Sequence, residues 1–207
     1  MKGKFIVIDG CDFTGKSTQI QKIASYLRNK NIKHITTREP GGTNFGEQIR
    51  EIILESGKKL HPYTEFLLFM SSRSEHIYGK IIPMLEQGVS IICDRFLASS
   101  FVYQGVLHGV PSEVILSVHK TILNNFQPNL TFIMDMNPEI ILQRMQAVEF
   151  KGCNAYDSTQ LKEIAQIRNG FLEFTKIQEC TIVDANQEQE KVFEVILRKI
   201  NEMFSIN

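Results

Sequence analysis

The chain has 207 residues, of which 43% are hydrophobic, and this size and composition suit one sizeable buried core. Lysine plus arginine and aspartate plus glutamate both number 23, so the net charge is zero and no basic face for nucleic acid is expected. No apolar run approaches about 18 residues and strand sequence begins near residue 4, so we expect a cytoplasmic protein without a membrane span or signal peptide.

Short apolar runs alternate with helical patterns along the chain. The runs cover residues 5–8, 33–37, 89–93, 130–135 and 181–184. The 3.6-residue periodicity predicts helices over 17–27, 44–55, 64–87, 112–124, 138–145, 161–175 and 189–204, with Asn44 and Ser112 as N-caps. Residues 146–155 lack a clear pattern and indicate a mobile loop. The alternation predicts an α/β fold, a doubly wound sheet of five parallel strands covered by helices on both faces.

A phosphate-binding loop follows the first predicted strand. Residues 10–18 read Gly10-Cys11-Asp12-Phe13-Thr14-Gly15-Lys16-Ser17-Thr18 and contain the pattern G-x-x-x-x-G-K-[ST] between a strand and a helix. Such a loop turns backbone N–H groups toward phosphate oxygens at the positive end of the helix dipole. Lys16 would reach the β- and γ-phosphates, and the Ser17 hydroxyl would bind Mg²⁺. We therefore expect ATP and Mg²⁺ here, in a sheet of the P-loop type.

Charged residues follow the predicted strands at 38–39, 94–95, 135 and 184, at the edge where doubly wound sheets bind ligands. Asp94 is a candidate to hold Mg²⁺ through water. The next residue is Arg95 and not a catalytic glutamate, which disfavours a water-activating ATPase and favours a clamp on a second phosphate. The sequence N-K-x-D, which reads guanine, is absent, so a GTPase is not expected.

The four cysteines, Cys11, Cys93, Cys153 and Cys180, form no C-x-x-C pair and have no metal-ligand spacing. We expect free thiols in a reducing compartment.

Several segments together resemble the thymidylate kinases, in their bacterial form. They are the loop at 10–18, R-E-P-G-G-T at 38–43, L-L-F at 67–69 with Arg73, D-R-F at 94–96 and S-S-F-V-Y-Q-G at 99–105. P-N-L-T at 128–131 and D-A at 184–185 extend the resemblance over nearly the whole chain. It implies a single nucleoside monophosphate kinase domain over residues 1–207 that converts ATP and dTMP to ADP and dTDP.

The resemblance also implies which residues bind dTMP. Arg38, Arg50 and Arg95 would surround its 5′-phosphate, with bidentate, charge-assisted hydrogen bonds. Phe69 would stack on the thymine ring, and Arg73, four residues on along one helix, would donate to its O4. The remaining contacts implied are those of Ser100 and Gln104 near the N3 and O4 edge, Tyr103 near the sugar, and Asp12 with the 3′-hydroxyl.

Two departures from the family concern catalysis. One branch of the family carries an arginine at the position of Phe13. The bacterial branch supplies arginines from a lid loop, here residues 144–157, in which the usual terminal Asp-Arg pair reads Asn154-Ala155. Such an arginine can be worth roughly 10³-fold in rate. The predicted catalytic residues are therefore Lys16, Arg95 and Asp12, with Arg144 and Lys151 in the lid.

Other interpretations remain open from the sequence: another small-molecule P-loop kinase, such as a deoxynucleoside kinase, or a nucleotide-binding module with a weakened lid. The resemblance alone implies a homodimer through helices beside the third strand, to which Met70 and Phe101 would contribute.

Overall fold

A five-stranded parallel sheet forms the centre of the protein in a computed structural model that describes residues 2–56, 60–149 and 158–206. Its strands are β1 (Phe5–Gly10), β2 (His34–Arg38), β3 (Ser90–Asp94), β4 (Leu130–Asp135) and β5 (Thr181–Asp184). They pair in the order β2-β3-β1-β4-β5, and every pair is parallel. All five predicted strands and their parallel arrangement are confirmed.

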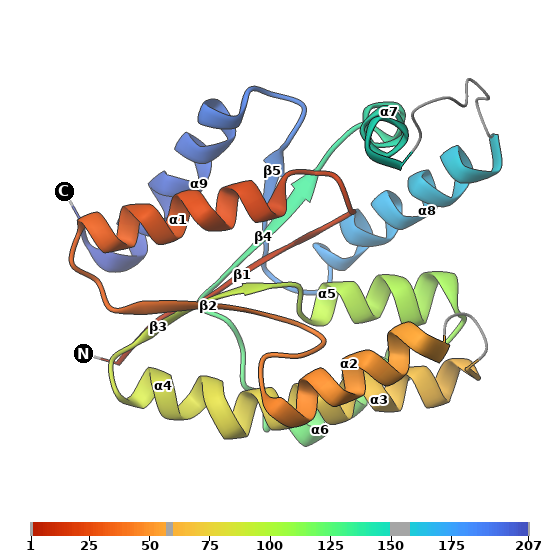
Figure 1. Cartoon of the computed structure of the whole chain (residues 1–207), viewed down its shortest axis with the longest axis horizontal. Coiled ribbons are helices and arrows are strands. Elements are labelled where there is room, and N and C mark those ends of the chain that lie inside the picture. The colour runs from red at the N-terminus through yellow and green to blue at the C-terminus, as the bar shows by residue number, and fades with distance from the viewer. Residues whose placement is uncertain (1, 57–59, 150–157, 207) are drawn as a thin grey trace.

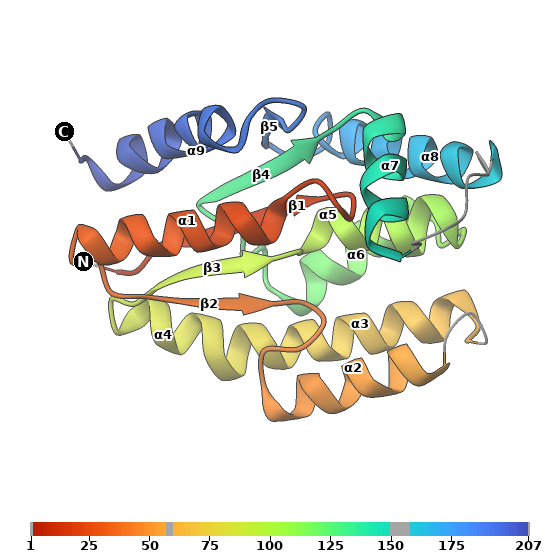
Figure 2. The same ribbon diagram turned by 45° about the horizontal axis from the view of Figure 1, so that its top comes forward.

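Helices cover both faces of this sheet (Figures 1 and 2). One face carries α1 (Lys16–Asn29) and α9 (Gln189–Phe204). On the other face, α4 (Ile82–Glu86) lies against β3 and α5 (Leu97–Ser100) lies against β1. The remaining helices are α2 (Asn44–Ser56), α3 (Pro62–His76), α6 (Ser112–Ile122), α7 (Pro138–Glu149) and α8 (Ser158–Phe174). Two π-helical segments, η2 (Ile77–Ile81) and η3 (Phe101–Leu107), continue α3 and α5. The doubly wound prediction is confirmed.

The core is built around β1, whose residues Phe5–Ile8 are fully buried because β3 and β4 flank the strand and helices cover both faces. The apolar face of α1 meets it with Ile23 and Leu27, which are also fully buried. Burying one such side chain is worth about 1.5–3 kcal/mol. This packing holds the end of β1 and the start of α1, and hence the loop between them, in one place.

The predicted long helix over 64–87 is present as one unbroken helical run, in which α3, η2 and α4 follow one another from Pro62 to Glu86. Pro83 lies near the end of this run, as predicted, in the first turn of α4. The helical segment 97–107 was not predicted. Its first turn is satisfied by Asp9, whose Oδ2 accepts hydrogen bonds from the backbone N–H groups of Phe96 (3.0 Å) and Ser99 (3.1 Å).

Three local predictions are wrong. The side-chain cap of α2 comes from Thr43 and not from Asn44, because the Thr43 hydroxyl accepts from the Gly46 N–H at 3.0 Å. Ser112 is the first residue of α6, and Pro111 precedes it without a side-chain cap. The predicted loop over 146–155 is helical as far as Glu149, where α7 ends; residues 150–155 lie outside the described ranges.

Candidate active site

The phosphate-binding loop joins β1 to α1 with the geometry that its glycines require. Gly10 has φ +133°, and a Cβ on it would lie 2.7 Å from the Met134 carbonyl oxygen of β4. Gly15, with φ +90°, precedes α1. Both are left-handed conformations that side chains disfavour, so glycine at these two positions lets the loop turn tightly over the first N–H groups of α1.

Lys16 is buried beneath this loop, with 7% of its surface exposed. Its Nζ donates to the carbonyl oxygens of Gly10 (3.1 Å) and Cys11 (2.7 Å) and lies 3.7 Å from the Asp12 carboxylate. Burial, and then the charge of Arg95, lower the pKa of Lys16. A phosphate in the loop would give this cation a stronger partner than the neutral carbonyls it contacts here.

Arg95 crosses from the end of β3 to the same loop. Its backbone has φ +71°, which costs of order 1 kcal/mol for a residue other than glycine. The side chain is fixed on several sides: Nη2 donates to Asp12 at 2.5 Å, Nη1 donates to the Ser99 hydroxyl at 2.9 Å, and the guanidinium lies 5.2 Å from the Tyr103 ring centroid. The structure therefore brings Lys16, Arg95 and Asp12 together, as predicted.

Asp9 supports Arg95 from within the core, a role that the sequence did not indicate. Its fully buried carboxylate accepts from the Ser99 hydroxyl at 2.6 Å, and the Arg95 Nη1 lies 3.9 Å from it. Asp9 thus fixes both the arginine and the start of α5. It is the next-to-last residue of β1, and an acid inside an otherwise apolar strand is the signal that would have found it.

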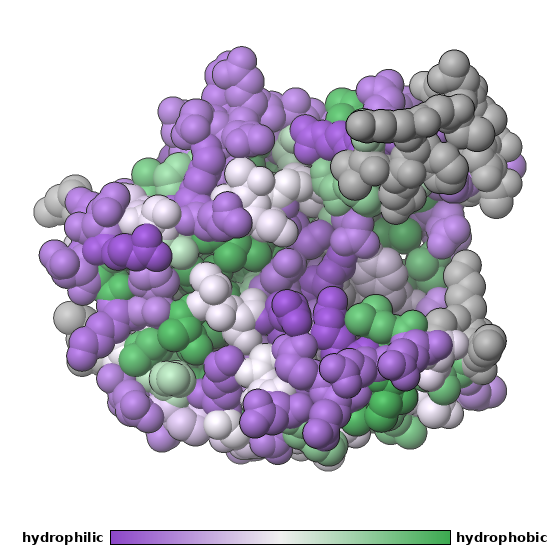
Figure 3. All heavy atoms as spheres, viewed as in Figure 1, coloured by the Kyte–Doolittle hydropathy of each residue, from purple (hydrophilic) through white to green (hydrophobic). Residues whose placement is uncertain are grey.

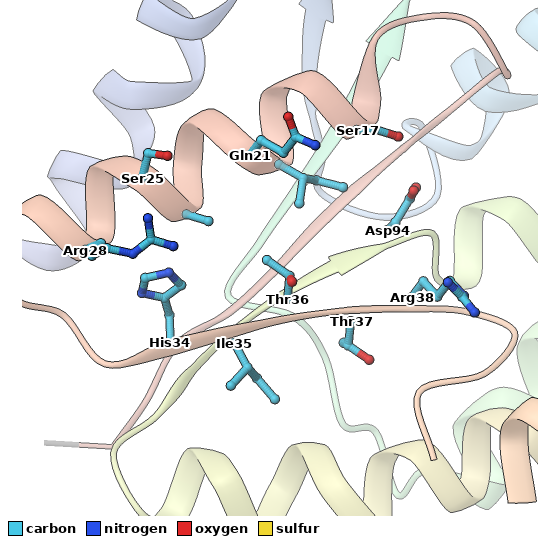
Figure 4. Close-up of a pocket in the computed structure, with 12 residues that line it drawn as sticks. Ser17, Gln21, Ser25, Arg28, His34, Ile35, Thr36, Thr37, Arg38 and Asp94 are labelled. Atoms are coloured by element: carbon cyan, nitrogen blue, oxygen red, sulfur yellow. The ribbon is translucent and has the colours of Figure 1, made fainter. Parts of the chain in front are cut away.

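Ser17 and Asp94 face each other across a groove between α1 and β2, with a volume of about 1030 Å³ (Figure 4). The Asp94 Oδ1 is buried and has no hydrogen-bond partner among the described residues. Burial raises the pKa of Asp94 in spite of Lys16 and Arg95 nearby. A hydroxyl and a carboxylate oxygen are ligands that suit Mg²⁺, which also keeps waters and takes phosphate oxygens from its substrate. No cluster of three or more His, Cys, Asp or Glu side chains in the described ranges would hold a metal by itself.

A second pocket, of about 510 Å³, opens on the other side of Arg38 and Asp94, which line both cavities. Its lining contains most of the predicted substrate residues, namely Asp12, Arg38, Arg50, Phe69, Arg73, Arg95, Tyr103 and Gln104. Four of them are arginines. The Arg38 Nη2 pairs with Glu47 at 2.8 Å, and the Arg50 Nη1 donates to the Pro40 carbonyl at 3.0 Å. The pocket lining therefore combines cationic side chains with an aromatic one, Phe69.

Arg73 is almost completely buried at this wall, with 1% of its surface exposed. Its Nε donates to Glu39 at 2.6 Å, and its Nη2 donates to the Phe96 carbonyl and to the Ser100 hydroxyl, both at 2.9 Å. Among the described residues, Nη1 has only the weak acceptor Met70 Sδ, at 3.7 Å. The arginine is thus fixed through two nitrogens, and the third keeps hydrogen-bonding capacity.

Glu39 is the residue that makes this burial possible, and the sequence did not predict its role. Burial alone would raise the pKa of Glu39, but the adjacent Arg73 and His76 outweigh it and lower that pKa, so the carboxylate is ionised. His76 donates to it or shares a proton with it at 3.2 Å and contacts the Thr37 hydroxyl at 2.8 Å. Glu39 belongs to the R-E-P-G-G-T segment, and the sequence of that segment does not indicate which of its six residues has this role.

Gln104 and Ser100 differ in position although both were predicted near a base edge. Gln104 lines the pocket, and its Nε2 donates to Glu65 at 2.8 Å. Its Oε1 is buried and has no partner in the described part of the chain. Ser100 is buried behind Arg73 and is absent from the lining of the pocket. Its hydroxyl acts on the pocket only through Arg73.

The predicted lid residues are partly described. Arg144, on α7, donates through Nη1 to the Phe13 carbonyl at 3.1 Å, which brings a second arginine to the phosphate-binding loop. Lys151 lies outside the described residues. A further arginine, Arg168 on α8, forms a bidentate pair with Asp135 at the end of β4, with distances of 2.6 and 2.9 Å. Helical spacing alone could not single out Arg168.

Three of the four cysteines lie in the described ranges. Cys11, Cys93 and Cys180 are free, as predicted, and burial raises the pKa of Cys11 to about 11; Cys153 lies outside the described ranges. No helix within the described ranges is long and apolar enough to cross a membrane.

Comparison with known proteins identifies one family over most of the chain. A sequence profile described as thymidylate kinase matches residues 8–196. The thymidylate kinase of Caldicellulosiruptor saccharolyticus is 40% identical over 205 residues, which cover 98% of each chain. That of Carboxydothermus hydrogenoformans is 39% identical and covers 93% of this chain and 94% of its own, and that of the Aster yellows witches'-broom phytoplasma is 38% identical and covers 98% and 99%.

Proposed function

The chain belongs to the thymidylate kinase family, an ATP-using phosphotransferase family that converts dTMP to dTDP, and we propose which residues perform that reaction here. The resemblance to the bacterial form of the family is thereby confirmed. In our proposal, residues 10–18 bind the phosphates of ATP, the pocket beside Phe69 binds dTMP, and the two meet at Arg38 and Asp94. Residues 1–207 act as one domain.

A matched pair of polar atoms in the pocket carries the assignment of dTMP. The Arg73 Nη1 offers a donor and the buried Gln104 Oε1 an acceptor, and both residues line the pocket with Phe69. Thymine presents an acceptor, O4, beside a donor, N3–H. Cytosine presents the reverse order, a donor amino group beside an acceptor nitrogen, and would leave both protein groups unpaired.

The rest of the nucleotide would follow from this orientation of the base. Phe69 stacks on the ring, and Ser100 helps by holding Arg73. The 5′-phosphate lies among Arg38, Arg50 and Arg95. Asp12 accepts from the sugar 3′-hydroxyl, and the ring of Tyr103 leaves no room for a 2′-hydroxyl.

Phosphoryl transfer requires positioning and charge neutralisation more than covalent help. An oxygen of the dTMP phosphate attacks the γ-phosphorus of ATP, a new P–O bond forms, and the bond to the β-phosphate oxygen breaks to release ADP. The second pKa of a phosphate monoester is about 6, so this nucleophile is largely dianionic at pH 7 without a protein base. Lys16 and Arg95 neutralise the charge that builds up on the transferred group, and Arg144 and Lys151 add to it from the lid.

Mg²⁺ fits the site between Ser17 and Asp94, because the buried Asp94 Oδ1 lacks a hydrogen-bond partner among the described residues and both groups offer oxygen. Ser17 would ligate the ion directly and Asp94 would hold its waters. When bound, it would supply positive charge that neutralises part of the charge of the ATP phosphates.

We also propose a cytoplasmic homodimer that acts without nucleic acid or membrane. Support for the location is the set of free cysteines. Support for the dimer is a group of exposed apolar side chains on α2 and α3, among them Phe45, Ile52 and Leu67 with 49%, 47% and 55% of their surfaces exposed. Figure 3 shows apolar patches over this part of the molecule. The expected contributions of Met70 and Phe101 are wrong, since 1% and 7% of their surfaces are exposed and both pack in the core.

The test is ADP release measured side by side with dTMP, dUMP, dCMP, dGMP and thymidine as acceptors. We expect dTMP to have the highest kcat/KM. Turnover of thymidine without turnover of dTMP would indicate a nucleoside kinase, and ATP binding without turnover of any acceptor would indicate a nucleotide-binding module.

A further inference from the structure

One of the two polar groups that the base pocket offers is oriented by another residue of the pocket wall. We propose that Glu65, held by His108, is the positioning residue that makes this kinase choose thymine over cytosine, because it fixes which end of the Gln104 amide faces the nucleotide. The inference rests on the proposed binding of dTMP in this pocket. Glu65 itself lies on α3, 39 residues before Gln104 in the chain.

The contact between Glu65 and Gln104 determines the direction of the amide. Glu65 Oε1 accepts a hydrogen bond from Gln104 Nε2 at 2.8 Å. An ionised carboxylate can only accept, so it attracts the NH₂ end of the amide and repels the oxygen end. Turning the amide by 180° would replace this hydrogen bond with two oxygens facing each other. The Gln104 Oε1 is therefore directed away from Glu65, and it is the buried acceptor that lacks a partner among the described residues.

His108 holds the second oxygen of the same carboxylate. Its Nδ1 lies 2.9 Å from Glu65 Oε2, and the carboxylate is largely buried, with 12% of the side chain exposed. With one oxygen on Gln104 and the other on His108, Glu65 has one rotamer that satisfies both. The pair forms the wall between the base pocket and a neighbouring cavity of about 580 Å³ that Leu60, Lys162 and Gln166 help to line.

Arg73 is likewise oriented by a buried carboxylate, that of Glu39. Its Nε donates a hydrogen bond to Glu39 at 2.6 Å, and its Nη2 donates to the Phe96 carbonyl and to the Ser100 hydroxyl. The Nη1 group is therefore left for a ligand. Two carboxylates of the pocket lining, Glu39 and Glu65, thus determine which donor and which acceptor are left for the base. If Glu65 no longer fixed the amide, Gln104 could turn its NH₂ group toward the acceptor N3 of cytosine. Only Arg73 would then distinguish thymine from cytosine, and the preference for dTMP would decrease.

The experiment compares kcat/KM for dTMP and for dCMP in three variants. Glu65→Leu removes the acceptor, and we expect the ratio of the two kcat/KM values to fall about 10-fold to 100-fold, which corresponds to losing roughly one discriminating hydrogen bond. Glu65→Gln keeps the size of the side chain but can donate as well as accept, so it no longer imposes one direction on the Gln104 amide, and we expect a ratio between those of the wild type and Glu65→Leu. Glu75→Gln, an exposed glutamate of the same helix, is the matched control and should leave the ratio unchanged.

The outcomes separate this inference from the proposed function. A wild-type enzyme that shows no preference for dTMP would overturn the proposed function itself. A wild-type preference that survives in Glu65→Leu, in protein shown to be folded by its melting temperature, would overturn only the role of Glu65. A wild-type ratio in Glu65→Gln would also overturn it, because a glutamine amide can donate to Gln104 as well as accept from it and so imposes no direction.

Discussion

The base pocket and the phosphate-transfer end of this site are built in different ways. In the base pocket, each ligand-facing side chain is held by a second protein group: Arg73 by Glu39, and Gln104 by Glu65. At the phosphate end, Lys16 contacts the carbonyl oxygens of its own loop, and Arg144 contacts another carbonyl of that loop. Recognition of the base is thus set by the fold, whereas Lys16 and Arg144 contact weak acceptors that phosphate oxygens would replace. Arg95, which Asp12 and Ser99 hold, is the exception at the phosphate end.

This difference predicts that substitutions at the two ends change different kinetic constants. Those at the phosphate end should lower kcat, since they remove charge that matters most in the transition state. Those in the base pocket should lower the affinity for dTMP and the discrimination between bases. The four predictions below test the comparison, from the largest expected effect to the smallest.

The largest effect is expected from Lys16→Met, because Lys16 is the cation closest to the phosphate-binding loop. We expect kcat to fall roughly 10³-fold or more, with the dissociation constant for dTMP changed only a few-fold. Stopped-flow ADP release and dTMP titration measure the two quantities. Lys22→Met, on the same helix and paired with Glu190, is the control. If Lys16→Met lost dTMP affinity as strongly as kcat, the two ends would not be separable.

In the base pocket, Arg73→Met should lower kcat/KM for dTMP about 10-fold to 100-fold through the loss of a charged hydrogen bond, with the KM for ATP nearly unchanged. It should also destabilise the protein by about 3–5 kcal/mol, because it leaves Glu39 buried without its cation.

The double variant Arg73→Met/Glu39→Gln distinguishes these two effects. We expect it to recover much of the melting temperature, since no buried charge is left unpaired, but to recover none of the dTMP affinity. Recovery of affinity together with stability would show that Arg73 has only a structural role. Equal losses for dTMP and ATP would contradict the assignment of the thymine edge.

His119, on α6, lies behind the base pocket, where it packs against the lining residue Phe96, and in the described part of the chain it lacks the polar partners that Arg73 and Gln104 have. It is 1% exposed and packs edge-on against Phe96, and neither of its ring nitrogens has a partner among the described residues. Burial lowers the pKa of His119 from 6.5 to about 3. Between these values the unfolded chain binds a proton that the folded protein does not, so the free energy of unfolding should fall as the pH drops below about 6.5.

His119→Leu should remove this dependence. Relative to wild type, we expect the variant to gain about 2 kcal/mol more stability at pH 5 than at pH 7, because 1.5 pH units below the unfolded pKa correspond to about that energy. Urea unfolding at the two pH values measures it. Other groups titrate equally in both proteins. If the difference in the free energy of unfolding between His119→Leu and the wild type did not increase from pH 7 to pH 5, His119 would not be buried as a neutral base.

The sequence predicted the phosphate end better than the wall of the base pocket, for a physical reason. Residues 10–18 and the five strands are local patterns, and their apolar runs and glycines determine structure within a few residues. The partners that fix the base pocket are distant in sequence: Glu39 and Arg73 are 34 residues apart, and Glu65 and Gln104 are 39 residues apart. Such contacts depend on the finished fold, so Arg73 was predicted and Glu39 was not. The helical segment from Leu97 was missed likewise, because Asp9 satisfies its first N–H groups from another strand.

The smallest effect is expected at the junction of the two regions, where Asp94 lines both cavities. Asp94→Asn keeps the size of the side chain but removes the charge that would hold the waters of Mg²⁺. We expect the Mg²⁺ concentration for half-maximal activity to rise about tenfold, a typical cost of losing a group that orients the metal's ligands. Activity measured across a Mg²⁺ titration, with Asp184→Asn at the end of β5 as the control, tests this, and EDTA should abolish activity in every variant. Because kcat at saturating Mg²⁺ and the preference for dTMP should both be retained, an unchanged Mg²⁺ requirement would remove Asp94 from the metal site and assign it to the pocket wall.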